Sequence, residues 1–253
     1  MNILITNDDG IYSEGIIKLA EAVEEFGEIV IIGPNRERSA TGHAITMHNP
    51  LRIEEITFLG TKYKIFAING TPADCVKLGV EGVLSQRPDL VLSGINKGPN
   101  LGTDVIYSGT VSAAIEASIY GIPSIAFSLA GFKNYDFELA KDIVKKIVDI
   151  VIKDDILKKS IFNVNIPVCS REEIKGFKIT KLGFRRYKDN FVKRMDPRGR
   201  VYYWLSGEVV EEVCDDNSDI CAVRNKFVSI TPIHFDLTDH VLFEKLKEYK
   251  LTI

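Results

Sequence analysis

The sequence predicts an α/β protein, with a Rossmann-like, doubly wound, mostly parallel sheet followed by a C-terminal β-hairpin arm and a terminal helix. Runs of branched apolar residues, typical of strands buried on both faces, alternate with amphipathic helical patterns. Beyond Pro167 the pattern changes to short β-like runs. A chain of 253 residues with 45% hydrophobic content can bury a large core and still carry an appendage. We therefore expect a core at 1–170 and a β-rich segment at 171–253.

The first strand is predicted at Ile3–Ile5, and it leads directly into Asn7, Asp8, Asp9 and Gly10. Ligands of such sheets bind in the crevice outside the carboxyl ends of the strands. Two adjacent carboxylates repel each other there, and a hard divalent cation is the simplest compensation. The alternative is that both aspartates only cap a helix or shape a turn. N-capping uses one side chain, however, and leaves the second carboxylate unexplained.

The next residues complete a βαβ unit. Apolar residues recur with helical spacing over Glu14–Phe26, Gly27 ends the pattern, and strand character returns at Glu28–Ile32. The polar loop Asn35–Gly42 then carries Ser39 where a second strand end would face the crevice. A serine in such a loop is also explained as a turn or cap residue.

The middle of the chain combines short β-like runs with one clear helix start. The runs, which we expect to form hairpin-like elements inserted before the sheet resumes, are Ala44–His48, Leu51–Ile56 and Tyr63–Ile68. Thr71 as N-cap, followed by Pro72 and Asp74, predicts a helix that runs to about Leu84.

The strand predicted at Pro88–Leu92 leads into the glycine-rich loop Ser93–Thr110. Gly94, Gly98 and Gly102 are spaced by four, which matches neither the dinucleotide motif nor the P-loop. The loop ends just before a helix at Val111–Tyr120, whose free N–H groups and positive dipole end attract an anion. The predicted phosphate-binding residues are Asn7, Ser108, Gly109 and Thr110. The alternative for Thr110 is that it serves only as an N-cap.

Three more core elements and a C-terminal arm complete the prediction. The core elements are a strand at Ile122–Phe127, a helix at Asp136–Ile152 and a last strand at Ser160–Ile166. The C-terminal elements are a β-rich arm at Arg171–Ser206, a return strand at Val228–Pro232 and a terminal helix at Thr238–Tyr249. The arm is rich in Arg and Lys, which indicates a solvated face, a site for an anionic substrate or a contact with another subunit.

Composition and charge narrow the possible partners. A net charge of -3 and a pI near 5.9 argue against broad binding to nucleic acid or to anionic membranes. The chain opens with a strand pattern and has no apolar stretch of ~18 residues, so we expect a cytoplasmic protein without a membrane partner. The cysteines lack metal or disulfide spacing and are predicted to be free thiols; they are Cys75, Cys169, Cys214 and Cys221.

The candidate metal ligands are all oxygen donors that follow strands of one sheet. They are Asp8, Asp9, Ser39 and Asn96. Such a set suits Mg²⁺ or Mn²⁺. A hard metal beside a phosphate-binding helix N-terminus indicates phosphoryl chemistry, with Asp8, Asp9 and Asn96 as the catalytic residues.

The sequence resembles the survival protein E (SurE) family of metal-dependent nucleotidases. The matching segments are Ile3–Gly10, NRERSATG with Ser39, Pro88–Ser118, Asp196–Gly199 and Ser229–Thr238. The resemblance implies hydrolysis of nucleoside 5'-monophosphates, often with some activity on 3'-nucleotides or short polyphosphate. It also implies that residues matching Asp8, Asp9, Ser39 and Asn96 hold the metal, and that the hairpin and C-terminal arm exchange between subunits. We therefore expect a homodimer or homotetramer. The family's glycine after Ser39 is Ala40 in this chain, which leaves the preferred nucleoside open.

Two alternatives stay open at this point. One is an RNA-binding or regulatory nucleotide-binding module without catalysis, because aromatic residues interleave with the basic residues of the arm. The acidic chain and the metal-type loops argue against it, and we expect no stable nucleic-acid complex. The other concerns the nucleophile, which is either water or an aspartate that forms a phosphoryl intermediate.

Overall fold

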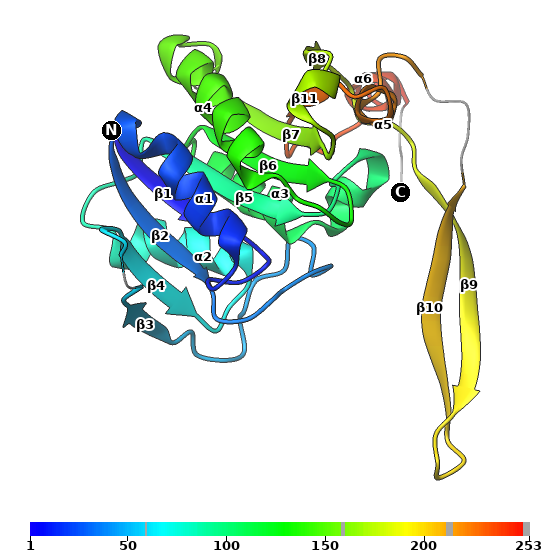
Figure 1. Ribbon diagram of the computed structural model, residues 1–253. Coiled ribbons are helices and arrows are strands. Elements are labelled where there is room, and N and C mark those ends of the chain that lie inside the picture. The colour runs from blue at the N-terminus through cyan, green and yellow to red at the C-terminus, as the bar shows by residue number, and fades with distance from the viewer. Residues whose placement is uncertain (59, 158–159, 211–214, 250–253) are drawn as a thin grey trace.

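The computed structural model describes residues 1–58, 60–157, 160–210 and 215–249 (Figure 1). Within these residues a nine-stranded sheet has the order β3-β4-β2-β1-β5-β6-β7-β11-β8, and β9 and β10 form a separate two-stranded sheet. The strands of the main sheet are β1 (Asn2–Thr6), β2 (Glu28–Pro34), β3 (Ile53–Ile56), β4 (Lys64–Ile68), β5 (Leu90–Lys97), β6 (Ser124–Ala130), β7 (Ile161–Pro167), β8 (Phe177–Ile179) and β11 (Val228–Ile233). Only the β3–β4 and β7–β11 pairs of this sheet are antiparallel. The predicted fold class is confirmed.

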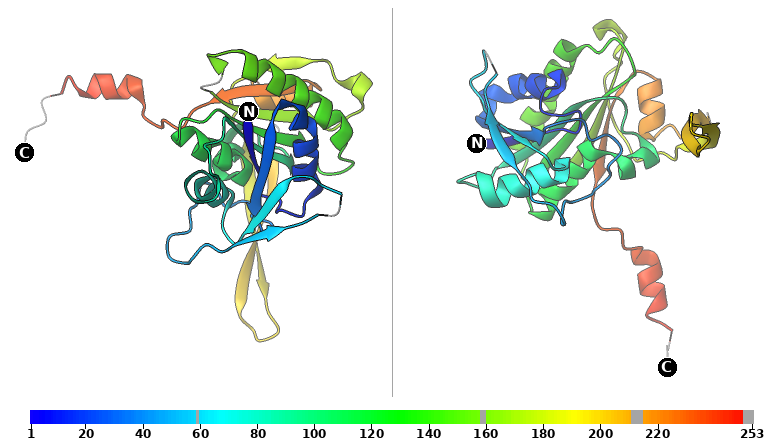
Figure 2. Two further views of the ribbon diagram at one scale, coloured as in Figure 1. Left: turned by 90° about the vertical axis from the view of Figure 1, so that its left-hand side faces the viewer. Right: turned by 90° about the horizontal axis from the view of Figure 1, so that it is seen from below.

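Helices cover both faces of the sheet (Figures 1 and 2). The helices are α1 (Glu14–Val23), α2 (Pro72–Leu78), α3 (Gly109–Ile119), α4 (Phe137–Lys153), α5 (Asp219–Arg224) and α6 (His240–Leu246). Side chains of β1 alternate between the two layers: Ile3 and Ile5 join the core cluster that includes α1 and α4, and Leu4 joins the cluster that includes α2 and α3. All three are at most 2% exposed. This two-sided burial explains why β1 reads as a continuous apolar run.

The predicted helix start at Thr71 is confirmed in detail. The Thr71 hydroxyl accepts a hydrogen bond from the Asp74 N–H, and the Asp74 carboxylate accepts one from the Thr71 N–H, which is a capping box. Asp136 caps α4 in a similar way by accepting from the Leu139 N–H at 2.9 Å.

Of the predictions for residues 44–68, one is wrong and one is confirmed in part. Ala44–His48 is not a strand, because its polar groups bond to the start of α2: the Thr46 N–H and hydroxyl donate to Asp74, and Ala44 O accepts from the Thr71 hydroxyl. The predicted hairpin-like pairing is confirmed for the other two runs, since β3 and β4 pair antiparallel, but this pair is part of the main sheet and not an insertion before it resumes. β4 pairs in parallel with β2, so the two strands extend the main sheet at its edge.

The strand β5 continues to Lys97, whereas the sequence predicted a loop from Ser93 onward. Its pairing with β6 is interrupted by a bulge between Ser93 and Asn96. Gly94 in this bulge has φ +132, and a Cβ there would lie 2.3 Å from Phe127 O. Gly94 therefore accommodates a bulge within the strand, and Asn96 belongs to the end of a strand.

The main sheet crosses the domain boundary predicted between 170 and 171. Both β8 and β11 lie C-terminal to it, so the strand predicted at Ser160–Ile166 is not the last of the core. The short helix α5 was not predicted. The division into a core and an oligomerisation segment stays a prediction.

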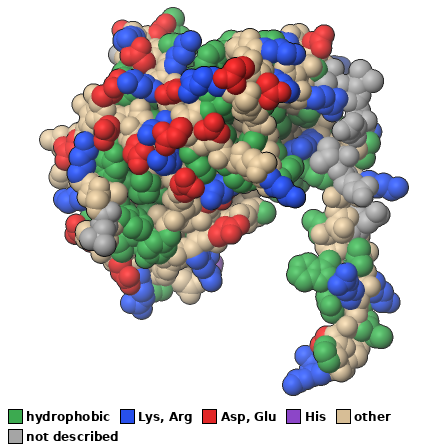
Figure 3. Space-filling view, in the orientation of Figure 1, with side chains coloured by type: hydrophobic (Ala, Val, Ile, Leu, Met, Phe, Trp, Pro, Cys, Tyr) green, Lys and Arg blue, Asp and Glu red, His purple; other side chains and the backbone are tan. Residues whose placement is uncertain are grey.

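The hairpin of β9 (Arg186–Met195) and β10 (Val201–Val210) projects from the body, and α6 extends away from the sheet (Figure 2). Apolar side chains are exposed along both, and those of the hairpin are visible in Figure 3. No helix among the described residues is long and apolar enough to cross a membrane. Cys75 and Cys169 are free thiols, as predicted, while Cys214 lies outside the described residues.

Candidate functional site

The carboxyl ends of β1 and β5 meet at the topological switch point of the sheet. The chain passes from β1 toward β2 and β4 on one side, and from β5 toward β6 and β7 on the other. Adjacent parallel strands that diverge in this way leave a crevice beyond their carboxyl ends, where ligands bind. Asp8 and Asp9 follow β1, and Asn96 lies near the end of β5, so these three residues share one edge.

Asp8 is buried and is held by the helix that follows the glycine-rich loop. Its side chain is 5% exposed, and its Oδ1 accepts a hydrogen bond from the Thr110 hydroxyl at 2.5 Å. Burial raises the pKa of this carboxyl, while hydrogen bonds from Thr110 act in the opposite direction. A buried negative charge with so little compensation favours a positively charged ligand.

Asp9 is half-buried and lies beside the end of β5. Its Oδ2 accepts a hydrogen bond from the Lys97 N–H at 3.0 Å. Burial, and then the charge of Asp8, raise the pKa of Asp9 to about 6, partly offset by the Lys97 N–H. The negative charge of Glu37 also raises the pKa of both aspartates. The sequence did not single out Glu37, so the edge is more acidic than predicted.

Asn96 and Ser39 differ in how firmly they are held. The Asn96 amide group donates from Nδ2 to Gly98 O at 2.9 Å, so its Oδ1 is the atom that remains to accept or coordinate. Ser39 is exposed, and its hydroxyl donates to Glu37 Oε1 at 2.6 Å. The neighbouring Arg38 N–H donates to Asp8 O at 2.7 Å, which brings the Ser39 loop to the same edge.

The turn Ser108–Thr110, which we call the phosphate turn, lies against Asp8. Ser108 is the N-cap of α3, because its hydroxyl accepts from the Val111 N–H at 3.1 Å. The alternative of Thr110 as N-cap is therefore wrong, and the Thr110 hydroxyl bonds to Asp8 instead. A Cβ on Gly109 would lie only 2.8 Å from the Asp8 Cβ. Only glycine allows so close an approach of α3 to the aspartate.

Asn7 is directed into its own loop. The side chain is fully buried, and its Nδ2 donates to Gly10 O at 2.9 Å and to the Ser13 hydroxyl at 2.7 Å. These bonds shape the loop that carries the two aspartates. A contact between Asn7 and phosphate stays a prediction.

A buried amide network that the sequence analysis missed holds the loop after Asn96. Asn100 O accepts hydrogen bonds from Asn163 Nδ2 and Asn165 Nδ2 at 2.8 and 2.9 Å, and the Asn100 N–H donates to Asn165 Oδ1 at 2.9 Å. The Asn100 Nδ2 also donates to the Ser128 hydroxyl. The available signal was the pair of asparagines within the otherwise apolar strand β7.

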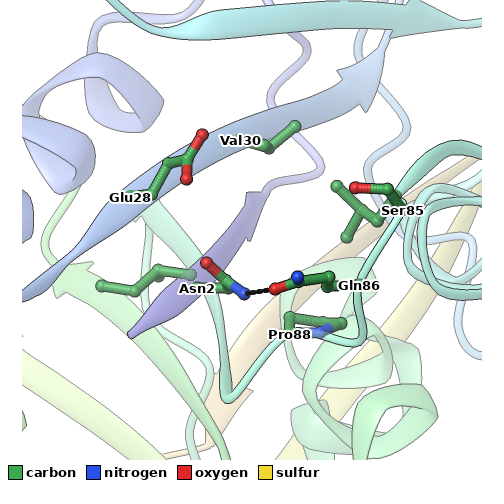
Figure 4. A pocket seen from close by; sticks show the side chains of 8 residues that line it. Asn2, Glu28, Val30, Ser85, Gln86 and Pro88 are labelled. Carbon is green, nitrogen blue, oxygen red and sulfur yellow. Dashed lines mark hydrogen bonds between the residues drawn. The ribbon is translucent and has the colours of Figure 1, made fainter.

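The pocket in Figure 4 lies at the amino ends of the strands, on the side of the sheet opposite the crevice. It has a volume of about 200 Å³ and is lined by residues that include Asn2, Glu28 and Gln86, at the amino ends of β1 and β2. Asn2 Nδ2 donates to Gln86 Oε1 across it at 3.1 Å. None of the predicted site residues lines this pocket.

The predicted metal site depends on two carboxylates with a hydroxyl and an amide oxygen. Within the part of the chain that the structure describes, no group of three or more His, Cys, Asp or Glu side chains could hold a metal. The donors present are nevertheless all oxygens, the type that Mg²⁺ and Mn²⁺ prefer.

Known proteins similar to this chain match it over nearly its whole length. Residues 3–189 match the family model described as survival protein SurE. A protein named 5'-nucleotidase SurE from Pelotomaculum thermopropionicum is 53% identical, covering 98% of this chain and 95% of the relative. One of the same name from Alkaliphilus metalliredigens is 50% identical, covering 99% of each. The crystal structure of the SurE protein from Aquifex aeolicus has a TM-score of 0.84 and 44% identity, with 98% of both chains covered. The chain belongs to the SurE family.

Proposed function

We propose that this protein is a 5'-nucleotidase that hydrolyses nucleoside 5'-monophosphates to nucleoside and phosphate with a divalent cation, Mg²⁺ or Mn²⁺. The names of its relatives support the activity. The observation that carries the proposal is the contact between Asp8 and the phosphate turn, with Thr110 Oγ1 at 2.5 Å from Asp8 Oδ1. This contact places a carboxylate that favours a cation beside a helix N-terminus that attracts an anion.

The proposed cation ligands are Asp8, Asp9, Ser39 and Asn96. The fit rests on their chemistry and on hydrogen bonds: Asn96 Nδ2 is occupied by Gly98 O, which leaves Oδ1 as a donor to a metal. When bound, the cation supplies Lewis-acid polarisation of the phosphate ester and a lowered pKa for water.

The chain's own residues orient the phosphate and stabilise the charge that develops on it. Ser108 opens α3, so the first-turn N–H groups and the positive end of the helix dipole face the edge where Asp8 lies. Fixed donors of this kind stabilise the oxygens of a phosphoryl group in the transition state. Asn7 is retained in the proposal as the fourth phosphate-binding residue, beside Ser108, Gly109 and Thr110.

We further propose that water, and not an aspartate, is the nucleophile. The Thr110 hydroxyl fixes Asp8 Oδ1 as an acceptor, and burial around the carboxylate restricts its approach to phosphorus. A single displacement by water inverts the configuration at phosphorus. Hydrolysis of a chiral thiophosphate ester in isotopically labelled water tests this, and retention or a trapped phosphoaspartate would reject it.

The decisive experiment for the activity is phosphate release from a panel of nucleoside monophosphates with Mg²⁺, Mn²⁺ or a chelator. Release from the 5'-monophosphates that stops on chelation is expected. We include 3'-nucleotides and short polyphosphate in the panel as proposed secondary substrates. The same panel tests the alternative of a nucleotide- or RNA-binding module without catalysis, which would bind the ligands without releasing phosphate.

We propose that residues 171–253 assemble the protein into a homodimer or homotetramer. The hairpin, α6 and the residues just before α6 expose large apolar side chains, among them Leu205 at 65%, Leu237 at 96% and Val241 at 85%. Apolar side chains exposed together in this way mark contact surfaces. A monomer at micromolar concentration in sedimentation would reject this. A cytoplasmic location stays a prediction.

A further inference from the structure

The base of the hairpin contacts the segment of the body that leads into the phosphate turn. We define the hairpin root as Gly183, Arg185 and Tyr187. These residues contact the 3-10 helix Gly102–Tyr107, which ends where Ser108 begins α3. In Figure 1 the hairpin descends from this side of the body.

Asp104 is the first of two carboxylates that join the root to the 3-10 helix. Its Oδ2 accepts a hydrogen bond from Arg185 Nη1 at 2.7 Å and from the Tyr187 hydroxyl at 2.6 Å. The Asp104 and Arg185 side chains are only 18% and 14% exposed. Burial and the bond to Asp104 raise the pKa of Tyr187 to about 12, so the phenol stays protonated and donates. Removing one partner of such a pair leaves the other poorly solvated.

Asp219 is the second carboxylate. It is fully buried, its Oδ2 accepts from the Gly102 N–H at 2.7 Å, and its Oδ1 accepts from the Gly183 N–H at 2.8 Å. A Cβ on Gly102 would lie 2.7 Å from Gly183 O, so the two backbones are in contact. Both carboxylates, Asp104 and Asp219, therefore hold the hairpin root against the 3-10 helix.

The path from Asp104 to the phosphate turn is short and hydrogen-bonded. Asp104 and Ser108 are four residues apart in the 3-10 helix and its C-cap, where the Ser108 N–H donates to Val105 O and Val105 is buried. At its end, Gly109 has no free space beside Asp8. A displacement of Asp104 would therefore move the phosphate turn relative to Asp8.

We propose that Asp104 and Asp219 are positioning residues that couple the hairpin root to the phosphate turn. The inference rests on the proposed function, because it takes the phosphate turn as the place that holds the substrate's phosphate. A second chain that binds the hairpin would then change the affinity of the phosphate turn for phosphate. Phosphate bound at the turn would in return stabilise the hairpin root.

The test compares Asp104→Asn, Tyr187→Phe and their double variant with Asp142→Asn. Asp142 pairs with Arg171 on the exposed surface of the body and serves as the matched control. The measurements are kcat and KM for adenosine 5'-monophosphate with Mn²⁺, the inhibition constant of inorganic phosphate, and amide hydrogen exchange of residues 102–110. Sedimentation confirms that all variants share one oligomeric state.

Asp104→Asn and Tyr187→Phe are each expected to lower kcat/KM about tenfold and to weaken inhibition by phosphate by a similar factor, since small displacements in a site cost this much or more. Exchange over 102–110 should rise about tenfold, and the double variant should lose less than the product of the single losses. The Asp142→Asn protein should stay within twofold of the wild type in all measurements.

Phosphate inhibition and exchange that both stay within twofold in Asp104→Asn would overturn the proposal, even if turnover fell. Should Asp104→Asn fail to fold, Tyr187→Phe carries the test, because it removes one hydroxyl from a residue that is 40% exposed. A wild-type protein that hydrolyses no nucleotide would instead reject the proposed function. Hydrogen exchange over 102–110 would still decide the coupling.

Discussion

Asp8 and Thr110 in the crevice are 5% and 0% exposed, whereas Trp204 and Leu205 on the hairpin are 60% and 65% exposed. The crevice is fixed by hydrogen bonds from several parts of one chain, through Arg38, Lys97 and Thr110. The hairpin strands pair only with each other. The difference is that hydrogen bonds within one chain fix the crevice, whereas the hairpin beyond its root leaves apolar side chains exposed, and for these we propose a contact with another subunit.

The strongest way to break the crevice is Asp8→Asn. The neutral amide keeps the shape but removes the charge, so we expect a loss of turnover of about 1,000-fold. Because burial raises the pKa of Asp8, its ionised form opposes folding above that pKa. The free energy of unfolding at pH 7 without metal should therefore stay equal or increase. Phosphate release and denaturant unfolding measure the two effects. Normal turnover, or marked destabilisation, would contradict this account of Asp8.

The next largest effect is expected from Gly109→Ala. The new Cβ would lie 2.8 Å from Asp8 Cβ and 3.1 Å from Pro72 Cγ, so α3 and the aspartate must separate. We expect kcat to fall about 100-fold and stability to fall by about 1–3 kcal/mol. Steady-state kinetics and thermal unfolding are the measurements. Gly82→Ala is the control, since its Cβ meets only the end of the Leu78 side chain. Equal kinetics for both variants would argue against a close-contact role.

Smaller effects are expected from Asn96→Ala and Ser39→Ala. Neutral ligands contribute less than charged ones, so each should weaken cation binding by about tenfold, less than Asp8→Ala does. Titration calorimetry with Mn²⁺ compares the variants, and Ser85→Ala at the opposite edge of the sheet is the control (Figure 4). Losses as large as that of Asp8→Ala would mean that the ligand assignment is wrong.

The smallest effect on the body is expected from Leu205→Lys at the hairpin. This side chain is 65% exposed in the single chain, so the free energy of unfolding in dilute solution should change by less than about 0.5 kcal/mol. Self-association should weaken, as measured by sedimentation equilibrium. Arg198→Ala in the hairpin turn is the control. Unchanged association in the Leu205 variant would exclude this part of the hairpin from the interface.

The sequence predicted the parts of the fold that local patterns encode. Three of these patterns each lie within one continuous stretch of sequence: the apolar run of β1, the Thr71–Asp74 capping box and the helical spacing of α4. The errors involve partners distant in the chain. Residues Ala44–His48 form hydrogen bonds to the start of α2, and the bulge in β5 depends on its pairing with β6. The strands β8 and β11 join the main sheet although they follow residue 170, where the core was expected to end.

The same distinction applies to the site. Asp8 and Asp9 stand out because two acids follow a buried strand, and Ser108–Thr110 because it precedes a helix. Glu37 and Asp219 do not stand out, since an acid in a polar loop or before a short helix is common. Only the folded chain shows that Glu37 affects both aspartates and that Asp219 joins Gly102 to Gly183.

Trp204 is the chain's single tryptophan, and it lies on the hairpin with its ring centroid 6.5 Å from that of Tyr202 in an edge-on arrangement. The protein therefore carries one tryptophan fluorophore, which can be excited selectively at wavelengths that tyrosine does not absorb, and it lies on the segment for which we propose a subunit contact. Its emission should shift to shorter wavelengths when a second chain covers it. A dilution series read at this wavelength would give the association constant without any label, and the rest of the molecule would add no tryptophan background.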